Sequence, residues 1–134
     1  MSTELFRTAQ KAELLQGMRH ARMAIGRGQV VCIPTDTSYA LVADAFKASA
    51  VQALRDARGM PDGAPLSVFV PGIPTLRALA AEVADDVATL AGEFWPGALT
   101  LIVPAGVSLS WDLGDTQGTV ALRMPANRIA LELL

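Results

Sequence analysis

Hydroxyl and carboxylate side chains gather in a short turn that directly follows an apolar stretch. Thr35, Asp36 and Thr37 come after the run VVCI, which is typical of a buried strand. Hydroxyls and backbone N–H groups at a strand end can bind a carboxylate, a hydroxyl or a phosphate. Ligands of open α/β sheets collect at such strand ends. The same residues also suit an Asx or ST turn that only reverses the chain, so the residues alone leave both interpretations open.

Two arginines are further candidates for binding an anion. Arg58 opens the Gly- and Pro-rich loop 58–65, where a guanidinium could hold a phosphate through two parallel hydrogen bonds or could simply be solvated. Arg123 ends the apolar run TVAL just before Met124 and Pro125, so it must find an anionic partner or reach solvent. That partner could be a ligand or a carboxylate of the protein, and the sequence does not choose between them.

Several common chemistries lack the residues that they need. The sequence has no P-loop, GxGxxG, HExxH or CxxC motif, and it holds one histidine and one cysteine, which excludes His/Cys metal clusters and gives a Ser-His-Asp triad no support. His20 falls on the polar side of a predicted helix, and Asp85 and Asp86 are expected on a solvated helix face. Cys32 is predicted to be a buried free thiol in a reducing compartment.

The hydrophobic pattern predicts the elements that position these residues. Helices are expected over 14–25, 50–57, 75–94 and 126–134, strands over 29–33, 66–70, 98–103 and 119–123, and a further extended segment over 39–46. Ser49 and Gln52 fit a capping box at the start of the second helix. Helices and strands alternate, so the fold class is α/β. The loop 104–118 is long, and long loops in compact domains are often functional.

Composition limits the classes of protein that fit. A chain of 134 residues with 51% hydrophobic residues is one domain with an ample core, and the aromatic share of 5% makes that core aliphatic. A net charge of −2 argues against a globally basic nucleic-acid binder. The first residues lack a signal-peptide pattern, and no apolar run reaches the roughly 18 residues that span a bilayer. The sequence therefore predicts a cytoplasmic protein without membrane contact.

Four segments occur in one order: PTDTSYAL, RGMPDGAPLSVFV, FWPGALTLIV and TVALRMP. Together they resemble the YrdC/YciO-type family, the threonylcarbamoyl-AMP synthases, whose typical segments read PTDTVYGL, KxRP…NPL, FWPGPLT and VRxP. Each motif alone is weak, but four in register over residues 20–134 are specific. The resemblance implies a twisted, mixed, open α/β sheet with flanking helices around a large cavity.

The resemblance also implies a nucleotidyltransferase reaction. Threonine, bicarbonate and ATP, with Mg²⁺, give threonylcarbamoyl-adenylate and pyrophosphate, and a partner transferase complex then modifies tRNA with the adenylate. The amine of threonine captures bicarbonate or CO₂ as a carbamate, which attacks the α-phosphate, so the protein supplies positioning and charge rather than a nucleophile. Family members have also been described as binders of double-stranded RNA.

Carried over by position, the family pattern assigns roles to five residues. Thr35, Tyr39 and Arg123 are expected to bind threonine, and Arg58, at the place of the motif lysine, and Leu66 are expected on the nucleotide and phosphate side of the pocket.

The sequence departs from the family pattern on that phosphate side. Met60 stands at the motif arginine, Ala64 at the asparagine, Phe69 at a common histidine and Ala40 at a glycine. The Ser-x-Asn motif of the family follows the VRxP helix, and we expect a single domain over residues 1–134 that lacks that segment. Three functions stay open: the synthase, a low-activity or non-catalytic paralogue that binds nucleotide or double-stranded RNA, and a carbamoyl-adenylate-forming relative with another substrate.

Overall fold

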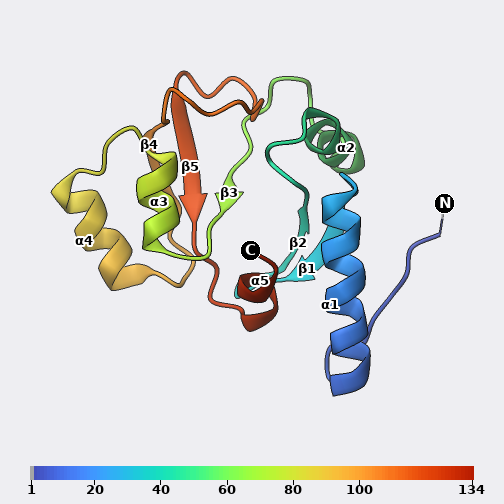
Figure 1. The fold of residues 1–134 in the computed structure, drawn as a ribbon. Helices are drawn as coiled ribbons and strands as arrows, with labels where there is room; N and C mark the ends of the chain where they lie inside the picture. The colour runs from blue at the N-terminus through green and yellow to red at the C-terminus, as the bar shows by residue number, and fades with distance from the viewer. Residues whose placement is uncertain (1) are drawn as a thin grey trace.

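The computed structural model describes residues 2–134, whose elements form two groups joined by α5 (Arg128–Leu133) (Figure 1). The first group holds α1 (Lys11–Gly26), β1 (Val31–Pro34), β2 (Tyr39–Val42) and α2 (Ala48–Arg58). The second group holds β3 (Val68–Phe69), α3 (Ile73–Leu79), α4 (Asp85–Phe94), β4 (Leu101–Pro104) and β5 (Thr119–Arg123). Helix α5 follows β5 but returns to the first group, where it contacts α1 and β1.

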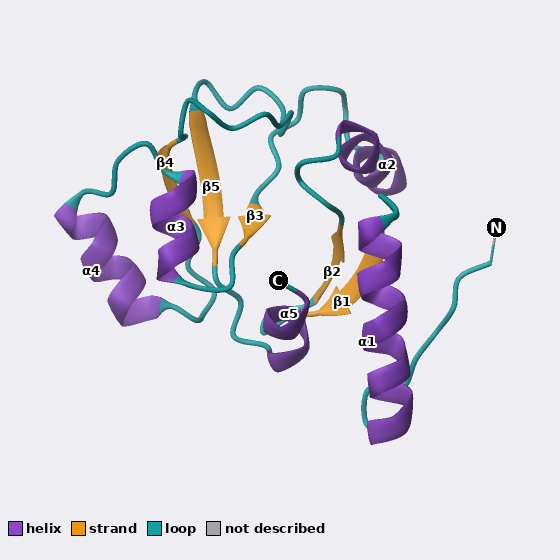
Figure 2. Ribbon diagram, viewed as in Figure 1, coloured by secondary structure: helices purple, strands orange, loops and turns teal. Residues whose placement is uncertain are grey.

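The strands are divided between two sheets (Figure 2). Strands β1 and β2 form an antiparallel hairpin in which Val31 lies opposite Val42 and Pro34 opposite Tyr39. The other sheet has the order β3-β5-β4, with β3 parallel and β4 antiparallel to β5. The predicted mixed α/β fold with flanking helices is confirmed, with two sheets among the described residues.

The core lies between the three-stranded sheet and helices α3 and α4. Side chains alternate along β5, so Val120 and Leu122 are buried against the core, with Leu76 of α3 and Ala91 of α4 in the same cluster. By the same alternation, Arg123 belongs to the opposite face of the sheet. The hydrophobic alternation of one short strand therefore decides on which side of the sheet the candidate arginine lies.

The prediction of one continuous helix over 75–94 was wrong. Helix α3 ends at Leu79 and α4 begins at Asp85. Between them the backbone turns to β pairing: Ala80 forms a bridge with Ala105, and the N–H of Ala81 donates to the carbonyl of Pro104 at 2.8 Å. No glycine or proline marks this break in the sequence. The helical pattern is interrupted because the chain pairs with the end of β4 instead.

Two smaller predictions were also wrong. The N-cap of α2 is Lys47 and makes no side-chain capping bond, so Ser49 lies inside the first turn rather than in a capping box. Cys32 is exposed, because the two-stranded hairpin has one covered face and Ile33 takes the buried position.

The other sequence features lie where they were expected, outside the candidate site. His20 is on α1 and partly exposed, with its Nδ1 2.9 Å from Oε2 of Glu4. Asp85 and Asp86 are exposed in the first turn of α4. In the described part of the chain, no helix combines the length and the apolar character that crossing a membrane requires.

Candidate functional site

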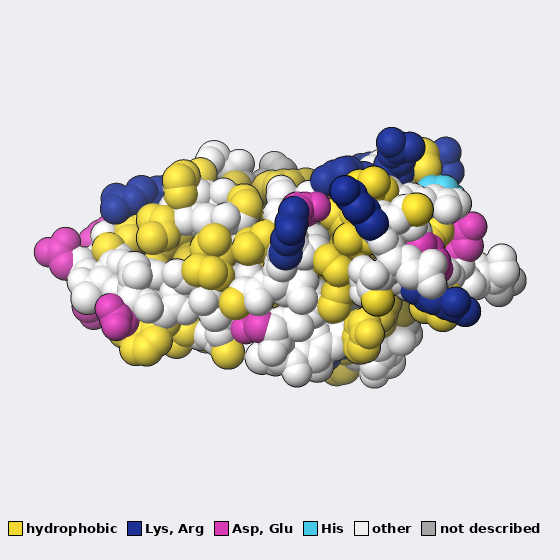
Figure 3. Space-filling model, turned by 90° about the horizontal axis from the view of Figure 1, so that it is seen from below, with side chains coloured by type: hydrophobic (Ala, Val, Ile, Leu, Met, Phe, Trp, Pro, Cys, Tyr) yellow, Lys and Arg dark blue, Asp and Glu magenta, His cyan; other side chains and the backbone are white. Residues whose placement is uncertain are grey.

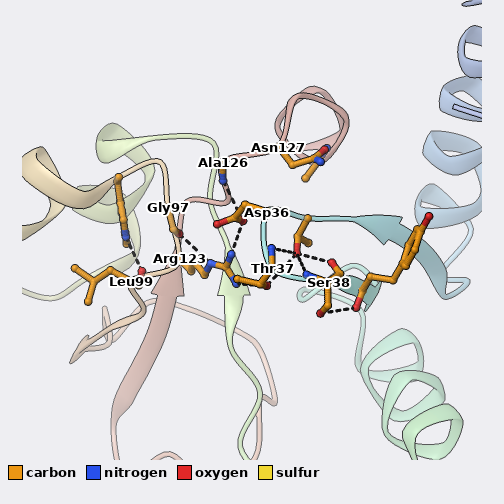
Figure 4. A network of polar contacts seen from close by, with 12 residues as sticks. Asp36, Thr37, Ser38, Gly97, Leu99, Arg123, Ala126 and Asn127 are labelled. Atoms are coloured by element: carbon orange, nitrogen blue, oxygen red, sulfur yellow. Dashed lines mark hydrogen bonds and ion pairs between the residues drawn. The ribbon is translucent and has the colours of Figure 1, made fainter. Parts of the chain in front are cut away.

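Segments from three of the four motifs meet at the guanidinium of Arg123 (Figure 4). Its Nε donates to the carbonyl of Gly97 at 3.0 Å, and its Nη2 forms an ion pair with Oδ1 of Asp36. Its Nη1 lies 3.5 Å from the hydroxyl of Thr37. The turn after β1, the FWPG turn and the end of β5 are therefore joined by one side chain.

The fourth motif supplies an aromatic ring at the same place. The parallel register of β3 and β5 puts Phe69 opposite Arg123, and the guanidinium carbon lies 5.7 Å from the centroid of the Phe69 ring. This distance falls within the range of a cation–π contact. Phe69, where the family has a histidine, thus contacts the candidate arginine directly.

The FWPG turn is held against the end of β5 from both sides. The N–H of Gly97 donates to the carbonyl of Met124 at 2.8 Å, while the carbonyl of Gly97 accepts from Arg123. Trp95 is buried in the core, and its Nε1 donates to the carbonyl of Leu99 at 2.7 Å. The turn forms a fixed corner beside Arg123, and its tryptophan anchors that corner to the core.

Asp36 connects the hydroxyl turn to two further segments. Its Oδ1 accepts from Arg123 and also from the backbone N–H of Ala126, at 3.2 Å. The next residue, Asn127, is the N-cap of α5, and its side chain accepts from the N–H groups of Ile129 and Ala130. The side chains of Asp36 and Arg123 are only 17% and 12% exposed, so this ion pair is largely shielded from water.

Thr35 closes the turn itself. Its hydroxyl donates to the carbonyl of Ser38 at 2.6 Å and accepts from the N–H groups of Thr37 and Ser38. This is the ST turn that the sequence left open as one interpretation. Its single O–H and both of its lone pairs are used within the turn, so the Thr35 hydroxyl fixes the shape of the turn. Thr37, whose hydroxyl lies 3.3 Å from that of Thr35, is the hydroxyl next to Arg123.

The other three predicted site residues lie away from Arg123. Tyr39 is 77% exposed and lines a groove of about 770 Å³ between residues 2–8, α1 and β1. Arg58 is the exposed last residue of α2. Leu66 is buried and borders a smaller hollow, of about 360 Å³, beside Ser67 and Thr119. The structure thus brings Thr35 and Arg123 together through Thr37 and leaves Tyr39, Arg58 and Leu66 elsewhere.

The loop that follows Arg58 is held by the long loop between β4 and β5. The N–H of Leu66 donates to the carbonyl of Leu113 at 2.9 Å, and that of Asp115 donates to the carbonyl of Gly63 at 2.8 Å. Gly114 has a φ of +98°, and a Cβ there would lie 2.5 Å from the carbonyl oxygen of Ala64. Only glycine fits at this crossing of the two loops.

Arg55 supports the same loop from inside the protein and was missed by sequence reasoning. It is 3% exposed, its Nη2 donates to the carbonyl of Ala64 at 3.4 Å, and its Nε has no partner among residues 2–134. An arginine on a helix next to Asp56 looks like a solvated residue in sequence, so no local signal marks it. Asp36 was named as part of the hydroxyl turn, but no pattern pairs it with a residue 87 positions away.

Comparison with known proteins places the chain in a family. Residues 23–134 match the Sua5/YciO/YrdC family model, described as "Telomere recombination". The chain belongs to this family. A relative from Mycobacterium tuberculosis (strain H37Rv) is 46% identical over 132 residues, which are 98% of this chain and 61% of that protein. The threonylcarbamoyl-AMP synthase of Pyrococcus abyssi is 38% identical over 117 residues, which are 87% of this chain and 34% of that protein.

Solved structures agree with the fold. The structure of P. abyssi Sua5 complexed with L-threonine matches with a TM-score of 0.81 and 37% identity, over 88% of this chain and 35% of that one. E. coli YciO matches with a TM-score of 0.79 and 25% identity, over 89% of this chain and 58% of that one. The family resemblance of the motifs is confirmed. The chain spans about three fifths or less of the length of these relatives.

Proposed function

We propose that this domain binds L-threonine beside Arg123 and takes part in forming threonylcarbamoyl-AMP from threonine, bicarbonate and ATP. The observation that carries the proposal is the meeting of the family motifs at one guanidinium. Relatives named threonylcarbamoyl-AMP synthase and a related structure with L-threonine support the substrate. These relatives favour the synthase over a non-catalytic paralogue or a domain with another substrate.

The chemistry needs positioning more than it needs a protein nucleophile. The threonine amine and bicarbonate give a carbamate and water. A carbamate oxygen then attacks the α-phosphorus of ATP, the bond to the β,γ-diphosphate breaks, and pyrophosphate leaves. Groups that orient the reactants and offset their charge lower the barrier of such a step.

The residues divide between the two substrates. Two N–H groups of Arg123 remain after its bonds to Gly97, Asp36 and Thr37, and they would donate to the threonine carboxylate. Thr35 would bind threonine indirectly, by fixing the turn that borders the amino acid, and Tyr39 would lie at the outer edge of the site. Arg58 is exposed and would approach phosphate oxygens of ATP, and Leu66 would border the nucleotide side.

The described residues do not supply a set of side-chain ligands for Mg²⁺. Residues 2–134 hold no group of three or more His, Cys, Asp or Glu side chains that could bind a metal, and Asp36 is already held by Arg123. These residues do not fit a protein-held ion, and we assign it no step. In the proposed reaction Mg²⁺ would enter as part of the MgATP substrate, because Mg²⁺ often binds through substrate phosphates.

RNA binding is less well supported as the main function. Figure 3 shows Lys and Arg side chains mainly on the half of the lower face that carries α1 and α5, with Asp and Glu side chains among them. Arg128, for example, pairs with Glu132. Such mixed charge does not make an uninterrupted basic surface for phosphates. We place the RNA one step later, where a tRNA-modifying transferase complex in the cytoplasm would consume the adenylate.

Isothermal titration of residues 1–134 with amino acids tests the proposal. We expect saturable binding of L-threonine that exceeds the binding of L-valine, which has the same shape without the hydroxyl. Pyrophosphate release from ATP should require both threonine and bicarbonate and should be weak, because Met60 replaces the arginine of the phosphate motif. Equal binding of threonine and valine would contradict the proposed substrate.

A further inference from the structure

We infer that Asp36 is a positioning and specificity-determining residue: it orients and neutralises Arg123 so that the site takes a zwitterionic amino acid and binds inorganic phosphate poorly. This deepens the proposed function and rests on it. Asp36 itself lies in the turn that carries the predicted hydroxyls, and its carboxylate faces the protein rather than the ligand.

Few contacts set the orientation of the Arg123 guanidinium. An arginine has five N–H donors in one plane, and three of them are used by Gly97, Asp36 and Thr37. The Thr37 contact, at 3.5 Å, is at the outer limit of a hydrogen bond, and the Phe69 ring contacts the guanidinium without fixing its rotation. Asp36 is therefore the partner that, together with Gly97, sets the direction of the two remaining N–H groups.

Asp36 is itself anchored to the backbone. Its Oδ1 accepts from both Arg123 and the backbone N–H of Ala126, so the carboxylate is held between β5 and the start of α5. The residue lies in a turn whose shape is fixed separately by the hydroxyl of Thr35. Because the backbone N–H of Ala126 gives the carboxylate an anchor besides the arginine, Asp36 can fix Arg123, which a freely rotating surface aspartate cannot do.

Asp36 also offsets the charge of Arg123. Both side chains are mostly shielded from water, and among residues 2–134 Asp36 is the carboxylate within ion-pair distance of Arg123. The pair is neutral as a unit, so the site meets a ligand with directed donors and little net positive charge. An amino acid with one carboxylate and one ammonium group fits such a site. A phosphate dianion needs more compensating charge than the pair leaves.

The substitution Asp36→Asn removes the charge of the side chain and keeps its shape. Asparagine keeps an oxygen that accepts from Ala126 and removes the negative charge, so the fold should survive while Arg123 gains uncompensated charge. We expect threonine affinity to fall about tenfold, as for a weakened charged hydrogen bond, and inorganic phosphate to compete with threonine severalfold better. Asp44→Asn is the matched control, because within residues 2–134 the side chain of Asp44 accepts from the backbone N–H of Phe46 alone, beyond the other end of the hairpin.

Nuclear magnetic resonance of the arginine side chains gives a readout that is independent of threonine. The Nη–H signals of Arg123, assigned by their loss in Arg123→Lys, report the group that donates to Asp36. They should exchange slowly with water in the unaltered chain and much faster in Asp36→Asn, with Asp44→Asn unchanged. An Arg123 signal unaffected by Asp36→Asn, or phosphate competition no stronger than in Asp44→Asn, would overturn the inference. The unaltered chain could fail to prefer threonine over valine while the proton exchange of Arg123 and the phosphate affinity still depend on Asp36. That result would contradict the proposed substrate and support the positioning role of Asp36.

Discussion

Two of the places where the two groups of elements meet are built in different ways. At the Arg123 cluster, the contacts are made by side chains of opposite charge and by one aromatic ring. At the crossing of loops 59–66 and 105–118, they are made by backbone hydrogen bonds and a glycine. The first junction depends on which residues are present, and the second depends mainly on backbone shape.

This difference follows the expected division of labour between the substrates. In the proposed function, the cluster around Arg123 would offer directed donors to a small amino acid. The loop after Arg58, where the family motif departs most, is rigidly supported by Arg55 and by the long loop rather than by its own side chains. Substitutions at the loop crossing should therefore act on stability, and substitutions at the cluster should act on ligand choice. The following predictions test that contrast, from the largest effect to the smallest.

Gly114→Ala should be the most destabilising change. The left-handed backbone costs roughly 1–2 kcal/mol for a residue with a Cβ, and the new Cβ would also lie 2.5 Å from Ala64 O and 2.7 Å from Gly63 O. We expect a loss of about 3 kcal/mol in the free energy of unfolding, measured in urea. Gly118→Ala is the control, because Gly118 has a φ of +77° but no atom within 4 Å of the added Cβ. Equal losses in the two variants would show that the loop crossing is not tight.

Arg123→Met should affect both stability and binding. It removes the partner of the largely buried Asp36 and the donor to Gly97, and breaking such a pair from one side is costly. Because some solvent reaches the pair, we expect the free energy of unfolding to fall by about 2 kcal/mol. We also expect no measurable threonine binding by calorimetry. Arg128→Met is the control, since the Arg128–Glu132 pair is exposed. Threonine binding that survives in Arg123→Met would remove the cluster from the substrate site.

The sequence predicted residues of the cluster but not the contacts between them. The four motifs, the α/β class and most elements follow from local pattern. Arg123 was expected to find either a ligand or a carboxylate, and the carboxylate is Asp36, 87 residues away. Strand alternation could place Arg123 on a face of the sheet, but only tertiary structure could bring that turn to it.

The failed predictions share a physical cause. The break between Leu79 and Asp85 and the exposure of Cys32 both depend on how strands pair, which is a property of distant segments. Arg55 is buried although Asp56 beside it is exposed, and its guanidinium donates to the carbonyl of Ala64 in the supported loop. Local periodicity carries no information on such partners, so these features required the structure.

The aromatic contact between the two halves should give a moderate effect. Phe46 and Trp111 are stacked with ring centroids 5.4 Å apart, which links the loop before α2 to the long loop. A double-mutant cycle with Phe46→Leu and Trp111→Leu should show a coupling of about 1 kcal/mol in the free energy of unfolding. Threonine affinity should not change, because neither ring contacts the Arg123 cluster. Additive losses would mean that the stacking does not join the halves.

Thr35→Ala should have the smallest effect and the one most specific to the turn. The change removes the hydroxyl that joins the carbonyl of Ser38 to the N–H groups of Thr37 and Ser38. Water can replace these bonds in an exposed turn, so unfolding should change by less than about 1 kcal/mol. The turn should nevertheless loosen beside Arg123, and threonine affinity should fall about threefold to fivefold by calorimetry. Thr35→Ser keeps the hydroxyl and should bind threonine normally. If Thr35→Ala and Thr35→Ser bind equally well, the hydroxyl has no part in holding the turn in its binding shape, and only the ion pair of Asp36 holds it there.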